Sequence, residues 1–302
     1  MRRRRLTRQE RGSEMETLLE PLSYAFFQKG LVVASLSGAI LGLIGVYIVL
    51  RGMSYIGHGL AHSIFGGFAA MQLFAAQFYA IGAGLWGIAS ALAITAVTKR
   101  SRVGADAAIG VITIASFALG VALFAKFGTS GPSFENALFG SILGITTGQI
   151  IGLVAVSILS SGFIFLRYRA LLFSTFDPDV AQVSGVNVSR IEAALMVVLS
   201  LAILATLTVI GVTLVAAMLV IPAVIARMLT DSFGRMLAYS TLIGTLCGFI
   251  GMYTSYYADV PSGTMIVLVG AALFIVVLAA TGGSGLRRSA GLDSHSEDLV
   301  SK

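Results

Sequence analysis

His58 and His62 lie within the apolar stretch MSYIGHGLAHSIFGGFAA, residues 53–70, whereas the third histidine, His295, belongs to a polar tail. A spacing of four residues places both imidazole rings on one face of a helix, about 6 Å apart along its axis. Imidazole is a ligand for zinc, copper, nickel and iron, whereas magnesium and calcium prefer oxygen atoms. The pair therefore predicts that His58 and His62 share one transition metal ion.

A histidine within a membrane helix can also be a neutral core residue that is hydrogen-bonded to a neighbouring carbonyl group. For a single histidine we would favour that structural role, but the four-residue spacing of two favours metal binding. Two ligands from one helix leave the coordination shell incomplete. Such a site suits a carrier, because four protein ligands would hold zinc too tightly for release.

The rest of the sequence offers little other chemistry. The phosphate-binding loop of ATPases, a glycine-rich segment ending in Lys-Ser or Lys-Thr, is absent from the sequence. The GxSxG motif of hydrolases is also missing, as are paired carboxylates within apolar segments. A metalloenzyme that uses the histidine pair would lack a general base. We therefore expect a protein that is not an enzyme and that binds no permanent cofactor.

The composition identifies the environment of the histidine pair. Of the 302 residues 57% are hydrophobic and 11% are charged, and the mean hydropathy is +0.92. Such a chain has too few polar groups to cover a soluble globule, so we expect an integral membrane protein. The net charge of +6 comes mostly from arginines in the first eleven residues and has no accompanying aromatic pattern, so nucleic-acid binding is not expected. Cys247 is the single cysteine and forms no disulfide framework.

Apolar segments long enough to cross a bilayer as helices follow one another along the chain. We predict an all-α, polytopic transmembrane bundle of about eight to nine spans within a single domain, residues 21–285. The polar ends, residues 1–20 and 286–302, are expected to lie outside that domain, the second as a disordered tail. The run from 193 to 226 is too long for one crossing and is divided at Gly211. The nine segments are 31–50, 54–77, 79–98, 106–126, 139–166, two within 193–226, 237–256 and 263–281.

Basic residues at the ends of these segments predict which side of the membrane each one faces. Arg51, the cluster 99–102, Arg167 with Arg169, and Arg287 with Arg288 all fall on one side, which we take as cytoplasmic. Counted from Arg51 along a helix, the histidines would lie about 10 and 16 Å deep. Nine crossings leave the arginine-rich N-terminus outside, so either translation starts at Met15 or the count is wrong by one span.

Two further patterns concern contacts. Gly140, Gly144, Gly148 and Gly152 share a helix face and predict close packing within the bundle, or alternatively a dimer interface. Asp177, Pro178 and Asp179 have the residue types of an N-cap and first turn, and Gly185 suits a left-handed exit. The second pattern predicts a short helix between spans that docks another protein.

Four segments together resemble the membrane permeases of bacterial zinc and manganese ABC importers. They are LRGMSYIGHGLAHSIFGG, TFDPDVAQVSGV, VIGVTLVAAMLVIPAVIARM and DVPSGTMIVLVGAALF, in the order found in that family, and the similarity extends from about Leu22 to Ala280. In such permeases the second span usually contains Asp-x-x-x-His on the metal path. His62 matches the family histidine, and His58 stands where aspartate is usual.

The resemblance implies a homodimeric channel in the bacterial cytoplasmic (inner) membrane. A dimer of a separate cytoplasmic ABC ATPase would drive it through the coupling helix at Asp177, Pro178, Asp179 and Gly185, and an extracytoplasmic metal-binding protein would supply a divalent transition metal, zinc or manganese. Histidine in place of aspartate favours zinc on its own, but the family binds both metals through mixed ligands. The alternative is a metal carrier or channel that needs no ATPase.

Overall fold

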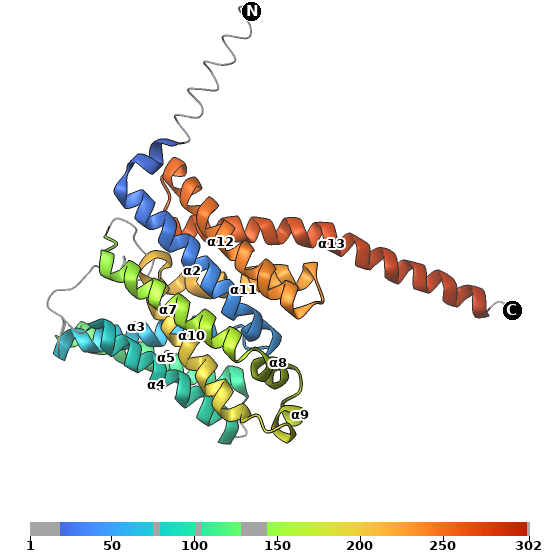
Figure 1. The fold of residues 1–302 in the computed structure, drawn as a ribbon, viewed down its shortest axis with the longest axis horizontal. Helices are drawn as coiled ribbons and strands as arrows, with labels where there is room; N and C mark the ends of the chain where they lie inside the picture. Colours follow the sequence, from blue (N-terminus) through green and yellow to red (C-terminus); the bar gives the residue numbers. More distant parts are fainter. Residues whose placement is uncertain (1–18, 75–78, 101–103, 128–143, 301–302) are drawn as a thin grey trace, which may run out of the picture.

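The computed structural model describes residues 19–74, 79–100, 104–127 and 144–300, and the long elements within these ranges are all helices (Figure 1). A short 3-10 helix, η1 (Glu20–Ser23), precedes them. Within the described ranges, nine helices of 18 or more residues correspond one for one to the nine predicted spans, which confirms the all-α transmembrane bundle. They are α2 (Ala25–Leu50), α3 (Ile56–Phe74), α4 (Tyr79–Arg100), α5 (Ala105–Phe127), α7 (Thr147–Leu166), α10 (Val188–Ile210), α11 (Val212–Leu229), α12 (Phe233–Ala258) and α13 (Ser262–Val300).

Seven of these helices are long and apolar enough to cross a membrane by their own composition: α2, α4, α5, α7, α10, α12 and α13. The remaining two are α11, whose apolar part is the shorter segment Val215–Leu229, and α3. Helix α3 contains His58 and His62, whose imidazoles lower its hydropathy. The helix with the candidate ligands therefore depends on its neighbours to be stable in the bilayer.

Most helix ends lie where turn chemistry predicts them. Gly211, with φ +82°, separates α10 from α11, and Asp259 ends α12 in the left-handed conformation with φ +54°. The predicted start of the fifth span is wrong: α7 begins at Thr147 because Thr146 and Gln149 form a capping box there. The sequence pattern missed that cap because the apolar run continues across it.

The segment after α7 contains two short helices, α8 (Tyr168–Phe176) and α9 (Pro178–Val183). The Asp177 carboxylate accepts a hydrogen bond from the Val180 amide at 2.9 Å, and Gly185 leaves the helix with φ +81°. Capped helix α9 thus confirms the structure predicted for 177–185, whereas α8 was not predicted. Figure 1 places both helices together at one end of the bundle.

Helix α2 lies at the centre of the bundle, with 15 of its 26 residues buried, and packs on α12, α11, α10 and α7. Its most extensive contact is with α12, where Gly38 faces Gly244 and the Ser240 hydroxyl donates a 2.6 Å hydrogen bond to the Gly42 carbonyl. Small residues allow backbones to approach in a bilayer, where burial from water does not drive helix association. Glycines therefore do bring helices of the bundle together, and Gly38 of α2 with Gly244 of α12 is one such pair.

The glycine pattern at 140–152 does not form the predicted packing face. Gly140 lies outside the described residues, and Gly144 precedes α7. A β-carbon at Gly144 or Gly152 would meet nothing within 4 Å, and Gly148 is exposed. The inward face of α7 instead consists of Leu153, Ser157, Ser160 and Ile164. Spacing alone reveals a shared face but not which neighbour the face contacts.

The C-terminal helix α13 runs from Ser262 to Val300, and its second half projects beyond the other helices (Figure 1). A projecting helix depends on its own propensity, which is marginal in water. The disorder expected of 286–302 remains a prediction, as do the domain boundaries. The arginine-rich segment 1–18, with Met15, lies outside the described residues.

Candidate metal site in helix α3

The two histidine rings meet on one face of α3, as their spacing predicts. The Nε2 atoms of His58 and His62 lie 3.1 Å apart, and the ring centroids are separated by 4.4 Å in an edge-to-face arrangement. Tetrahedral zinc, with Zn–N bonds of about 2.0–2.1 Å, requires two nitrogens about 3.3 Å apart. A small rotation of either ring therefore allows both Nε2 lone pairs to bind one ion.

The helical count from Arg51 to the histidines, on which the expected depth rests, is wrong. Helix α2 ends at Leu50, and α3 starts only at Ile56, so residues 51–55 add no helical rise. Measured along α3, His58 and His62 lie about 3 and 9 Å from the first residue of the helix. The pair is thus in the first two turns of α3, close to the end of the bundle that contains Arg51.

Aromatic rings border the histidine pair on both sides. Tyr55 lies 5.7 Å from the His58 ring, and Phe117 of α5 lies 4.9 Å from the His62 ring in an edge-to-face contact. The Nδ1 atom of His62 is buried, and no hydrogen-bond partner for it occurs among the described residues. Burying a nitrogen that has no hydrogen-bond partner costs free energy. The surroundings of His62 therefore stabilise it less than those of an ordinary buried histidine would.

Glycines on α3 bring its neighbours close to the histidines. Gly57 lies against Leu219 of α11, and Gly59 lies against Thr113 of α5, where added β-carbons would collide with both side chains. Gly57 and Gly59 flank His58 in the sequence. The backbone on both sides of His58 is therefore buried, while the His58 side chain stays partly exposed. The packing therefore fixes the direction in which the imidazole points.

A cluster of hydroxyl groups fixes the next turn of α3. Ser63 lies 2.5 Å from the Ser90 hydroxyl of α4 and 2.9 Å from the Ser116 hydroxyl of α5, and Trp86 donates its indole N–H to Ser116. Buried hydrogen bonds between side chains specify one arrangement of the helices that contribute them. Since Ser63 follows His62 directly, the cluster holds His62 at a fixed height relative to α4 and α5.

The described residues of the single chain do not supply a complete coordination shell of nitrogen, sulfur and carboxylate ligands. Within the segments that the structure describes, no group of three or more histidine, cysteine, aspartate or glutamate side chains could hold a metal ion. Water, hydroxyl and carbonyl oxygens of the described residues could supply further ligands. A two-nitrogen site completed by exchangeable oxygens binds a transition metal and releases it again.

Comparison with known proteins identifies the family. The model of the ABC 3 transport family matches residues 23–281, nearly the whole membrane region. The chain belongs to the ABC 3 transport family. It is a membrane permease subunit, not an ATPase, and a multi-pass protein of the bacterial cytoplasmic membrane.

Relatives and a solved structure agree with this assignment. The chain is 39% identical over 253 residues to the manganese transport system membrane protein MntC of Halalkalibacterium halodurans, covering 84% of this chain and 86% of that protein. It is 34% identical over 262 residues to a probable iron transport system membrane protein of Haemophilus influenzae, covering 87% and 96%. PsaBC from Streptococcus pneumoniae, solved in complex with Fab, superposes with a TM-score of 0.79 at 28% identity, covering 87% and 95%.

In this ABC 3 permease, Arg51 and Glu192 are functional candidates that sequence reasoning missed. Arg51 ends α2, and its Nη1 atom lies 3.5 Å from Glu192 Oε1 in α10. The sequence did mark Glu192 as unusual, because this acidic residue lies directly before a long run without charged residues. However, the two residues are 141 positions apart in the sequence, so no local pattern pairs them.

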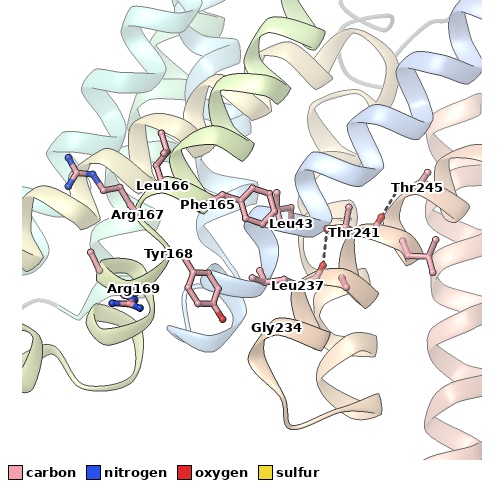
Figure 2. A pocket seen from close by; sticks show the side chains of 13 residues that line it. Leu43, Phe165, Leu166, Arg167, Tyr168, Arg169, Gly234, Leu237, Thr241 and Thr245 are labelled. Atoms are coloured by element: carbon pink, nitrogen blue, oxygen red, sulfur yellow. Dashed lines mark hydrogen bonds between the residues drawn. The ribbon is translucent and has the colours of Figure 1, made fainter.

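A pocket of about 990 Å³ lies elsewhere in the permease, between the α7–α8 junction, α2 and α12 (Figure 2). Figure 2 shows Arg167, Tyr168 and Arg169 at the junction, with Thr241 and Thr245 of α12 on the other side. None of the lining side chains is a histidine, cysteine or carboxylate. This pocket therefore lacks the donors that a transition metal prefers, and the histidine pair remains the candidate site.

Proposed function

We propose that this permease moves a divalent transition metal into the cytoplasm through the site formed by His58 and His62. The 3.1 Å separation of the two Nε2 atoms carries the proposal, because it matches the spacing at which one metal ion binds both rings.

Zinc is the metal that the ligands favour, and manganese is the main competitor. Imidazole pairs select borderline metals over manganese, which accepts oxygen ligands more readily. Relatives named for manganese and for iron transport support a transition metal in general. The predicted two-copy assembly, the ATPase dimer on α9 and the extracytoplasmic metal-binding protein belong to the same proposal.

The test is uptake of Zn²⁺ and Mn²⁺ into proteoliposomes that contain the permease with its ATPase. We expect His62→Ala to abolish uptake while the assembled complex stays intact, because one imidazole cannot hold the ion at this position. His295→Ala, which removes the histidine of the C-terminal tail, is the matched control and should transport normally. Normal uptake by His62→Ala would contradict the proposal, and equal uptake without the ATPase would favour an ATPase-independent carrier.

A further inference from the structure

Arg51 occupies a rigid corner between α2 and α3. It is the C-cap of α2, and the following Gly52 has φ +69°. The Gly52 amide donates to the Val49 carbonyl and the Met53 amide donates to the Ile48 carbonyl, which is the Schellman arrangement. Helix α3 begins at Ile56, five residues after Arg51, and His58 lies in its first turn. A displacement of Arg51 therefore acts on the chain close to the metal site.

The Arg51 guanidinium joins this corner to two other elements. Its Nε donates to the Thr175 hydroxyl at 3.2 Å, its Nη2 donates to the Ser174 hydroxyl at 2.8 Å, and its Nη1 lies 3.5 Å from Glu192. Both hydroxyls donate to the Leu171 carbonyl, which turns their lone pairs toward the guanidinium. The side chain of Arg51 is only 7% exposed, so its charge is balanced by these partners.

The partners of Arg51 connect directly to the segment where an ATPase would dock. Ser174 and Thr175 form the last turn of α8, which ends at Phe176. Asp177 then serves as both the C-cap of α8 and the N-cap of α9. Because a single residue joins the two short helices, a push on α9 displaces the hydroxyls that Arg51 binds.

A cavity of about 420 Å³ surrounds this contact. Its walls include Arg51, Glu192, Pro178 of α9 and Ile56 of α3, together with Thr98 of α4. Close-packed side chains resist displacement, whereas a cavity beside a hydrogen-bonded cluster gives the cluster room to shift. The cavity therefore lies between the docking helix and the helix with the histidines.

We infer that Arg51 is the positioning residue that transmits movement of α8–α9 to the histidine pair. This inference rests on the proposed function. The planar guanidinium binds three acceptors from α8 and α10 in a fixed orientation, which a flexible side chain would not do. When the ATPase displaces α9, Arg51 carries the displacement to the start of α3 and changes the access of His58 and His62 to the cytoplasm. Arg51 does not bind the metal itself.

The experiment measures two rates on one preparation, Zn²⁺ uptake and ATP hydrolysis, in proteoliposomes containing the permease and its ATPase. We expect Arg51→Gln to assemble and hydrolyse ATP, with the number of ions taken up per ATP falling by about tenfold or more, because the link between α8 and α3 is lost. Arg51→Lys keeps the charge but reaches fewer acceptors, so its ratio should be intermediate. Arg190→Gln removes an exposed arginine from the same end of α10 and should leave the ratio unchanged.

A second variant keeps the test decisive if Arg51→Gln does not assemble. Ser174→Ala combined with Thr175→Val removes the two hydroxyls of α8 while Arg51 and Glu192 remain paired, and the ratio should fall as in Arg51→Gln. A wild-type ratio in an assembled variant would overturn the inference, as would a parallel loss of uptake and ATP hydrolysis, since a purely structural contact affects both together. Absence of uptake by the wild-type complex would instead contradict the proposed function.

Discussion

At the scale of single residues, His58 is the position that should determine metal preference. The family resemblance places aspartate there, whereas His62 is the usual residue. The Nε2 atom of His58 lies 3.1 Å from that of His62, so it is a direct candidate ligand. Replacing one nitrogen by oxygen changes the class of metal that the pair favours.

We predict that His58→Asp shifts uptake from zinc toward manganese. A carboxylate adds negative charge and a hard oxygen donor, both of which favour manganese, and the ratio of Zn²⁺ to Mn²⁺ uptake should fall by about tenfold or more. The measurement is competitive uptake of the two ions by the reconstituted complex. His58→Ala is the control, because it removes the imidazole without adding a carboxylate. An unchanged ratio in His58→Asp would exclude His58 from metal selection.

The histidine pair was predictable from the sequence because its geometry is local. A four-residue spacing fixes the relative position of two side chains on any helix. The contact of His62 with Phe117 and the pairing of Arg51 with Glu192 depend on how distant helices pack, and the sequence contains no such information. The helical count from Arg51 to the histidines was wrong because residues 51–55 form a turn between α2 and α3 and do not continue a helix.

At the scale of elements, the sequence predicts helices and caps better than it predicts contacts. Asp177, Pro178 and Gly185 identify α9 because each acts on its own backbone. The glycines near 148 and 152 share a face of α7 as expected, yet nothing in their spacing shows that this face points away from the bundle. Gly38 and Gly244, which do join two helices, are separated by 206 residues, so their pairing is recognised only in the folded chain.

The contact between α2 and α12 should tolerate no added side-chain atom. At Gly38 a β-carbon would collide with the backbone carbonyl of Gly244, which no rotamer change relieves. We predict that Gly38→Ala destabilises the permease by about 3 kcal/mol or more through overpacking. Thermal unfolding of the purified protein in detergent, followed together with its elution as a single species, provides the measurement.

Gly110→Ala is the matched control for this substitution. Gly110 lies within α5, and a β-carbon there would meet nothing within 4 Å. Alanine stabilises a helix relative to glycine by about 0.5–1 kcal/mol, so this variant should unfold at the same temperature or slightly higher. If Gly38→Ala were as stable as Gly110→Ala, the close approach of α2 to α12 would be wrong.

At the scale of the whole molecule, the chain buries one face of α7 and leaves the other uncovered. Leu159 is 54% exposed and Leu166 is 86% exposed, and both lie on the same side as Gly148 and Gly152, because they follow Gly152 by two and four helical turns. Exposed apolar residues alone are expected where a helix faces lipid. Two glycines at four-residue spacing on that face indicate a protein contact, because they allow a second helix to approach the backbone of α7.

This arrangement favours α7 as the contact between two copies of the permease, the alternative that the glycine pattern had left open. We predict that Leu159→Cys forms a disulfide-linked dimer when membranes are oxidised, because the same residue of two symmetry-related α7 helices would meet at the interface. The parent chain should not crosslink, since its single cysteine, Cys247, is 1% exposed. Ile114→Cys provides the matched control: Ile114 of α5 is 68% exposed but has no such pair of exposed glycines beside it. If Ile114→Cys crosslinked and Leu159→Cys did not, the interface would lie on α5, and α7 would face lipid.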